Sequence, residues 1–436
     1  MGRQNYSKYR RELSVDQLIK ENYAAFEQLP DPRNRVINST MADVCQSAFA
    51  MFHLKFPSLL DFDTATVAQK DNLSSVYNIK QACSDTQMRR LLDPIEGRVI
   101  HQRLVDIVNV HAQRSGVLKQ FCVFTDRLAV SLDGVEHFRS SKVKCDHCLS
   151  KQSKGQPRQY YHQMLCGSLV HPDHRQVLPV VAEPIIRQDG ERKNDCERNA
   201  AQRVITRLGA DYGDHKLLVL ADGLYSCGPV IKALREGGHQ FIITVKPGDH
   251  KSLFTHFAAR SERKQTRKLT IKSQGIEHQF EWANNLPLNG SWANLRLNML
   301  KYRQIDPKGE SLTFSWVTDR PLRANTVERV MRCGRSRWKI ENETFNTLKN
   351  QGYNFAHNYG HGKDQLSTVL AYLMLLAFSI DQLIEICSQQ FQAIVKQART
   401  RVKVWFQQRA LFTTDRWDDF AGIYGRLAEL FGVQLI

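Results

Sequence analysis

The chain has 436 residues and a net charge of +17, with a pI near 9.5. So large a positive excess argues against an enzyme of small metabolites and predicts a polyanionic partner, most simply nucleic acid bound at its phosphates. Ten scattered cysteines without an apolar leader argue against a disulfide framework and favour a reducing cytoplasm, and the longest apolar run, 369–380, is too short to cross a bilayer, so we expect no membrane partner.

Residues 1–120 are predicted to form a helical N-terminal domain for DNA binding or dimerisation. Apolar residues recur at helical spacing over 15–29, 41–56 and 100–117. Ser84 is the predicted N-cap of a further short helix. The basic helix faces favour docking to DNA, although a helical bundle with a solvated basic face has the same pattern.

Residues 121–247 are predicted to form most of an α/β sheet domain. The expected strands are 121–124, 128–132, 160–170, 176–181, 217–221 and 241–245. Helices are expected at 199–208 and 230–236. Because the strands are first antiparallel and then alternate with helices, the sheet should be mixed.

Residues 248–320 interrupt this alternation with a β-rich insertion. Its predicted strands are 267–273, 278–282, 295–303 and 312–318. Residues 321–390 return to helix and complete the sheet domain, and residues 391–436 form a basic C-terminal helical segment. Arg399, Arg401 and Lys403 make part of that segment a predicted DNA-binding surface.

Three carboxylates are distinguished by their positions. Asp133 and Asp222 each end a predicted strand before a glycine, and ligand sites in open α/β sheets lie at the carboxyl ends of strands. Glu341 lies on a predicted helix among apolar residues, where its charge needs compensation. An ordinary i,i+4 ion pair with Arg337 also accounts for it. Carboxylates suit Mg²⁺ or Mn²⁺, and a pair of such ions can activate a water or a 3′-hydroxyl at phosphorus.

On these motifs the chain resembles the DDE transposases of bacterial insertion sequences, in the branch with a β-rich insertion and a YREK-type signature. The resemblance rests on Leu-Asp-Gly at 132–134, Ala-Asp-Gly-Leu-Tyr at 221–225, and Arg-Trp-Lys-Ile-Glu at 337–341 followed by Lys349. Arg337 corresponds to the signature Arg and Lys349 approximates its Lys, so both are expected to contact DNA.

The resemblance implies an RNase H-like core in which Asp133, Asp222 and Glu341 bind two ions of Mg²⁺ or Mn²⁺. It also implies DNA cleavage with strand transfer of the cut-and-paste type. The expected partners are double-stranded DNA, at the terminal inverted repeats and at the target, and a second copy of the chain on that DNA. The expected location is the nucleoid in a bacterial cytoplasm. The alternatives are an RNase H-like nuclease without strand transfer and a domesticated, non-catalytic DNA-binding protein.

The sequence departs from the signature in two places. The signature Tyr falls at Gly334, and Lys349 lies one residue later than the usual spacing from the Glu. These departures leave Glu343 as a rival to Glu341. We prefer Glu341, because the Arg-Trp-x-Ile-Glu frame fits and Glu343 points to another helix face.

A second group of residues predicts a structural metal site. Cys145 and Cys148, in the basic loop 136–158, have the CxxC spacing typical of zinc ligands. His162 and Cys196 are expected to complete a four-ligand site, with His147, His171 and His174 as alternatives. Free thiols in a loop are the other interpretation.

Two further features are candidate DNA contacts. Relatives of this fold stack a flipped base on an aromatic residue of the insertion, where this chain has Trp282, Trp292 and Trp316, the last expected in the core. The segment 357–363 can bind phosphate through backbone N–H groups and Lys363, or can be a His-rich turn.

Overall fold

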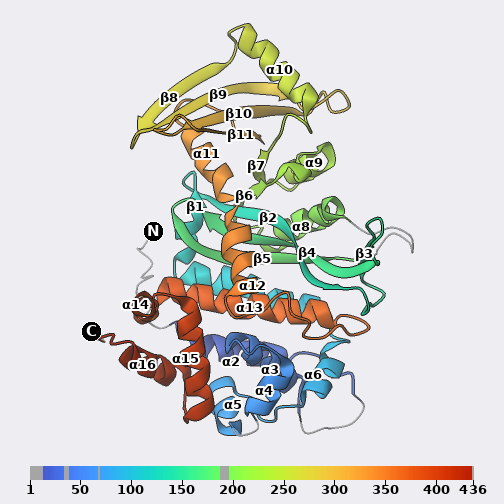
Figure 1. Cartoon of the computed structure of the whole chain (residues 1–436), viewed down its shortest axis with the longest axis vertical. Coiled ribbons are helices and arrows are strands. Elements are labelled where there is room, and N and C mark those ends of the chain that lie inside the picture. Colours follow the sequence, from blue (N-terminus) through green and yellow to red (C-terminus); the bar gives the residue numbers. More distant parts are fainter. Residues whose placement is uncertain (1–12, 34–38, 67–68, 187–195, 435–436) are drawn as a thin grey trace.

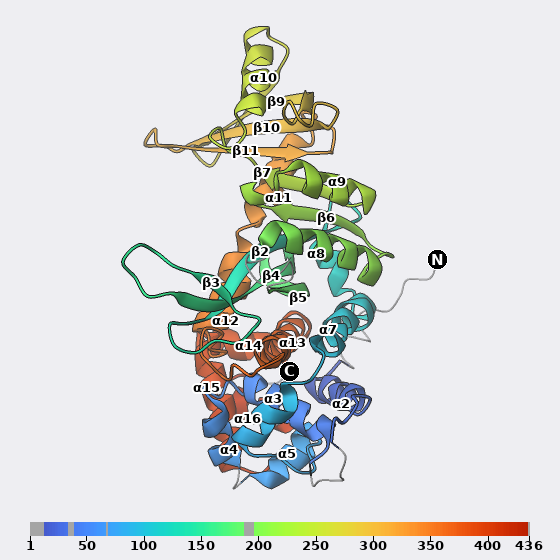
Figure 2. The ribbon, with the colours of Figure 1, turned by 90° about the vertical axis from the view of Figure 1, so that its right-hand side faces the viewer.

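The computed structural model describes residues 13–33, 39–66, 69–186 and 196–434. The molecule is elongated, with a β-rich extension at one end, a mixed sheet in the middle and a body of helices at the other end (Figure 1). The N-terminal and C-terminal helices lie together in that helical body, as a second view shows (Figure 2). The mixed α/β fold with a β-rich insertion is therefore confirmed.

The N-terminal part of the helical body follows the apolar spacing of the sequence. Its helices are α2 (Val15–Phe26), α3 (Met41–His53), α4 (Leu59–Thr66), α5 (Lys70–Tyr77), α6 (Asp85–Leu92) and α7 (Gly97–Asp106). Ser84 caps α6 by accepting a hydrogen bond from the Gln87 N–H at 3.3 Å, as predicted. The expected helix at 100–117 begins at Gly97 and changes to a π-helical turn over Ile107–Ala112.

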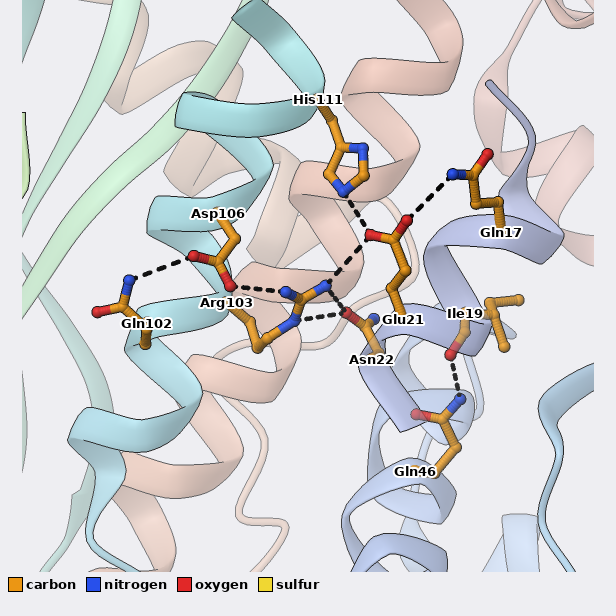
Figure 3. A network of polar contacts seen from close by, with 9 residues as sticks. All are labelled: Gln17, Ile19, Glu21, Asn22, Gln46, Gln102, Arg103, Asp106 and His111. Carbon is orange, nitrogen blue, oxygen red and sulfur yellow. Dashed lines mark hydrogen bonds and ion pairs between the residues drawn. The ribbon is translucent and has the colours of Figure 1, made fainter. Parts of the chain in front are cut away.

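A polar network ties α2 to α7 and the π-helical turn (Figure 3). Glu21 on α2 lies 2.7 Å from Nε2 of His111 and 3.9 Å from Arg103, and it accepts a hydrogen bond from Gln17 at 3.1 Å. Arg103 also donates to Asn22 and pairs with Asp106 at 2.6 Å. Since Arg103 is largely buried, these partners satisfy a cation that would otherwise destabilise the helix contact.

The C-terminal segment folds back onto the N-terminal helices. Its helices are α13 (Leu366–Cys387), α14 (Gln389–Ala398), α15 (Arg401–Thr414) and α16 (Phe420–Leu430). Asn72 of α5 donates to the carbonyl of Phe412 on α15 at 2.8 Å, and the rings of His53 and Phe420 lie 5.0 Å apart. The predicted N-terminal domain and C-terminal segment thus share one apolar core.

Helix α13 is the one helix in the described ranges that is long and apolar enough to cross a membrane. Of its most apolar window, 94% is buried inside the protein. It therefore serves as the central core helix, between the sheet and the N-terminal helices (Figure 1).

The central strands have the topology of an RNase H-like core. In chain order they are β1 (Cys122–Val123), β2 (Arg127–Ser140), β3 (Leu149–Lys151), β4 (Gln159–His171), β5 (His174–Ile185), β6 (Lys216–Ala221) and β7 (Gln240–Thr244). β4 pairs antiparallel with both β2 and β5, whereas β2, β6 and β7 are parallel neighbours. Helices α8 (Glu197–Asp211) and α9 (Gly228–Glu236) make the crossovers between them, as predicted.

The β-rich insertion extends this sheet. It contains β8 (Arg267–Ser273), β9 (Ile276–Pro287), β10 (Arg296–Ile305) and β11 (Ser311–Thr318), close to the predicted strands. A helix that was not predicted, α10 (Lys251–Glu262), precedes them. Because β11 pairs antiparallel with β7, the insertion and the core form one 11-stranded sheet.

The chain returns from the insertion through an interrupted helix. It begins as α11 (Val327–Ser336), passes through a π-helical turn over Ile340–Phe345, and ends as α12 (Asn346–Asn350). The sequence predicted one regular helix here. The π-helical turn adds a residue to the local repeat and so displaces every later side chain around the helix.

Candidate active site

Two carboxylates from distant segments are bridged by one arginine. Nη1 of Arg337 lies 3.3 Å from Asp133 Oδ2, and its Nη2 lies 2.7 Å from Glu341 Oε1. The Ser131 hydroxyl donates to the carbonyl oxygen of Arg337 at 2.9 Å, which fixes the start of the π-helical turn against β2. The i,i+4 pair between Arg337 and Glu341 is present, and Asp133 shares the same guanidinium.

Asp222 lies beside Asp133 because of the strand register. β2 and β6 are parallel neighbours, with Ser131 opposite Leu220, so the residue two positions beyond each is an aspartate at the same level of the sheet. The Asp222 carboxylate accepts the Leu224 N–H at 2.8 Å, which holds the turn after β6. Asp222 follows its strand as predicted. Asp133 does not end its strand, since β2 continues to Ser140.

The crowding of these carboxylates is reflected in the protonation of Asp133. Burial raises the pKa of Asp133 to about 7; Arg337 opposes this rise, whereas Glu341 and Asp222 add to it. One guanidinium therefore compensates the negative charge of the group incompletely. A site of this kind favours an additional cation.

Asp133 and Glu341 line one surface pocket, together with Glu136, Asn346 and Lys349. Lys349 lies on its wall, although the sequence places it one residue late for the signature. The π-helical turn between Glu341 and Lys349 supplies the reason, because one extra residue in the turn brings the later position back to the same helix face.

The rival carboxylate points elsewhere. Glu343 pairs with Arg175 on β5 at 2.6 Å and does not line the pocket. Gly334, which stands at the position of the signature Tyr, has no room for a larger side chain. The indole of Trp316 packs against it, and a Cβ at residue 334 would lie 2.5 Å from Trp316 Nε1. Trp316 thus fills the space beside α11 in which a larger side chain could not fit.

Two neighbours of the carboxylates were not predicted. Glu197, in the first turn of α8, covers Gly134, and it accepts hydrogen bonds from Tyr225 at 2.8 Å and from Gln163 at 2.5 Å. Burial, with the negative charges of Glu197, Asp133 and Asp222, keeps the pKa of Tyr225 far above its usual value. Tyr225 is therefore a permanent donor. Its place directly after Ala-Asp-Gly-Leu was the available signal, whereas nothing in the sequence near Glu197 distinguishes it.

One predicted DNA-binding residue is buried in the structure. Arg401 is buried and pairs with Glu385 at 2.7 Å, because its helix packs against the end of α13. Arg399 and Lys403 lie on the exposed face of the same segment. The prediction for Arg401 is therefore wrong, whereas Arg399 and Lys403 remain accessible.

The loop after α12 has a different role from the predicted phosphate loop. The backbone N–H groups of Lys363, Asp364 and Leu366 all donate to the carboxylate of Asp93, at 2.8–3.0 Å. These donors are therefore not free for phosphate. The side chain of Lys363 is exposed and stays a candidate contact.

The three tryptophans of the insertion differ in accessibility. Trp282 and Trp316 are both buried, and Trp292 is partly exposed beside Gly228. Trp338, which follows Arg337 in the sequence, is 44% exposed and lines a second pocket with Arg332 and other basic side chains. Helical spacing places Trp338 on the same face as Glu341, and in the structure its side chain stays partly exposed, whereas Phe345 and Leu348 are buried.

The predicted zinc ligands are brought together in part. Cys145, Cys148 and His162 converge, and their fourth neighbour is His361 from the loop after α12. Cys196 was predicted in that place, but it is exposed at the N-terminus of α8 and is not a member of the cluster. The sequence could not reveal His361, because it is 213 positions from Cys148 and only tertiary folding brings the two together.

Comparison with known proteins identifies the family of the chain. A family model described as the transposase DDE domain matches residues 135–379, more than half of the chain. The matched range contains Asp222 and Glu341 and begins just after Asp133. No curated protein matches the chain.

Proposed function

Because this chain belongs to the transposase DDE domain family, we propose that it is a DNA transposase that cleaves the terminal inverted repeats of its element and transfers the ends to a target. The observation that best supports this activity is the carboxylate pocket, in which burial and neighbouring carboxylates raise the pKa of Asp133 to about 7 despite the guanidinium of Arg337. Structural ion pairs do not need such an excess of negative charge.

Asp133, Asp222 and Glu341 are the residues that would hold the divalent ions, Mg²⁺ or Mn²⁺. The donor set fits, since oxygen ligands suit these ions and the pocket is undercompensated by one arginine. When bound, a pair of such ions activates the attacking water or 3′-hydroxyl and stabilises the leaving oxygen.

The chain's own side chains position the reacting DNA. Arg337 holds Asp133 and Glu341 in a fixed relation, and Tyr225 orients Glu197 over Gly134. Lys349 offers a cation to a phosphate in the same pocket. These groups supply orientation and charge, which is most of what a protein contributes to phosphoryl transfer.

The exposed cations Lys363, Arg399 and Lys403 are proposed contacts to the DNA backbone away from the pocket. Joining two ends requires both to be held at once, so we expect a homodimer on paired ends in the bacterial cytoplasm.

The test is incubation of the protein with DNA that carries the element's terminal repeats, a target plasmid and Mg²⁺. The proposal expects nicked ends and joined products. Cleavage without joining would indicate a nuclease and not a transposase. Binding without cleavage would indicate a non-catalytic DNA-binding protein.

A further inference from the structure

Four soft and borderline donors converge next to the sheet, in Cys145, Cys148, His162 and His361. Their ligand atoms all lie within 4.8 Å of one another. The two Sγ atoms are 3.9 Å apart, and Nε2 of His162 lies 3.5 Å from Cys145 and 3.7 Å from Cys148. Nε2 of His361 lies 3.3 Å from Cys148 Sγ.

Four of the six separations match those of a tetrahedron around one ion. Zn–S bonds of about 2.3 Å and Zn–N bonds of about 2.0–2.1 Å place two sulfurs about 3.8 Å apart and a sulfur about 3.6 Å from a nitrogen. Each of the four distances above falls within about 0.3 Å of those values. A disulfide would need the sulfurs at about 2.05 Å, so Cys145 and Cys148 are not bonded to each other.

The donors also select the ion. Two thiolates with two imidazoles are a zinc set, whereas Mg²⁺ and Ca²⁺ prefer oxygen. All four tetrahedral positions are filled by side chains, which leaves none for a substrate and indicates a structural site.

The surroundings suit a closed metal site. Cys148 and His162 are buried, and the ring of Phe138 lies 4.5 Å from that of His361 and 5.8 Å from that of His162. Phe138 is also the strand partner of His162, so β2 and β4 hold these two rings together. The Cys145 N–H points to Cys148 Sγ at 3.5 Å, a contact that favours the thiolate form.

We propose that Cys145, Cys148, His162 and His361 bind one structural zinc ion that clamps the loop after β2 to the loop after α12. β2 carries Asp133, and the interrupted helix that ends in α12 carries Glu341 and Lys349. The ion thus cross-links the two segments whose ends build the carboxylate pocket. It also fixes a basic loop, 141–158, which projects from the side of the core together with β3 (Figure 2).

The site is tested on full-length protein purified from zinc-supplemented medium, by elemental analysis and by the spectrum after replacement with Co²⁺. The wild type should hold about one zinc per chain and give the visible bands of a tetrahedral cobalt ion with thiolate charge transfer. Cys148→Ser and His361→Asn should each lose the ion. Cys196→Ser and Asp133→Ala should keep it, because neither residue belongs to the cluster.

Removal of the ion by a chelator gives an independent readout that does not depend on DNA cleavage. Amide exchange should rise several-fold in 141–158 and 351–365, while α13 stays protected, since the main core is large enough to fold without the metal. Wild-type protein without zinc and with freely reactive thiols at Cys145 and Cys148 would overturn the site. Zinc retained by His361→Asn and lost by Cys196→Ser would overturn its ligand set.

Discussion

Asp133 and Asp381 are both withdrawn from water, yet their surroundings have opposite effects. Asp381, on α13, is fully buried, but Lys55 at 2.7 Å and the neighbouring His53 outweigh burial and hold its pKa below the usual value. At Asp133, burial and two neighbouring carboxylates outweigh Arg337, and the pKa rises to about 7. A buried carboxylate whose charge is compensated by protein cations connects parts of the fold. A carboxylate whose charge is not compensated by the protein favours binding of a cation from solution.

The largest effect on DNA cleavage is expected when one of the three carboxylates of the candidate metal site is removed. Asp133→Ala, Asp222→Ala and Glu341→Ala should each lower DNA cleavage by at least about 10³-fold, since a lost metal ligand removes several kcal/mol of transition-state stabilisation. Cleavage of labelled end DNA measures this. Glu343→Ala is the matched control and should retain most activity, because Glu343 pairs with Arg175 outside the pocket. Equal losses for Glu341→Ala and Glu343→Ala would contradict the assignment.

Asp381, whose charge is compensated by Lys55, should instead contribute to the stability of the fold. Asp381→Asn leaves the buried ammonium of Lys55 without its counter-charge and should lower the free energy of unfolding by about 3–5 kcal/mol. Denaturant titration measures the change. The exposed pair of Asp126 and Lys216 offers the control, and Asp126→Asn should leave the midpoint nearly unchanged. Similar midpoints for both variants would show that Asp381 is not a structural anchor.

Neutralising Asp133 should stabilise the metal-free protein. Its folded pKa of about 7 exceeds the unfolded value of 3.8, so the folded state binds more protons between these values and loses stability as pH rises through them. In EDTA at pH 8, Asp133→Asn should therefore gain on the order of 2–4 kcal/mol, an advantage that shrinks as pH falls toward 4. Thermal unfolding across this range is the measurement, and a pH-independent difference would argue against a raised pKa.

The smallest effects are expected in the C-terminal segment, where the cations Arg399 and Lys403 are exposed and Arg401 is buried. Charge reversal of Arg399 and Lys403 should weaken binding of end DNA and make its salt dependence shallower by about one per lost phosphate contact. Arg401→Gln should lower stability with little change in the salt slope, because Arg401 pairs with Glu385. Fluorescence anisotropy at several salt concentrations distinguishes the two. An unchanged slope after reversal of Arg399 and Lys403 would remove this surface from the DNA contacts.

The sequence predicted what depends on local periodicity. The continuous apolar run 217–221 predicted the buried strand β6, and Ser84 predicted the start of α6. The sequence did not predict that β2 continues beyond Asp133, because an Asp-Gly pair favours a turn. Only the structure shows that the side chain of Glu197 packs against Gly134 within the strand. The π-helical turn after Glu341 was missed for a similar reason, as no residue type marks it.

The candidate sites were predictable only as far as their members lie near one another in sequence. Cys145 and Cys148 are recognised by their spacing, whereas His361 joins them through tertiary packing. Arg401 was misassigned because charge alone does not reveal an internal partner such as Glu385.

Asp133 is proposed to bind the divalent ion used in DNA cleavage, and replacing its carboxylate by a thiolate tests this assignment most directly. Asp133→Cys should fail to cleave end DNA with Mg²⁺ and regain cleavage with Mn²⁺, which accepts a thiolate more readily. Glu343→Cys, outside the pocket, should cleave with either ion. Cleavage by Asp133→Cys in Mg²⁺ at the wild-type rate would show that the Asp133 carboxylate is not a metal ligand.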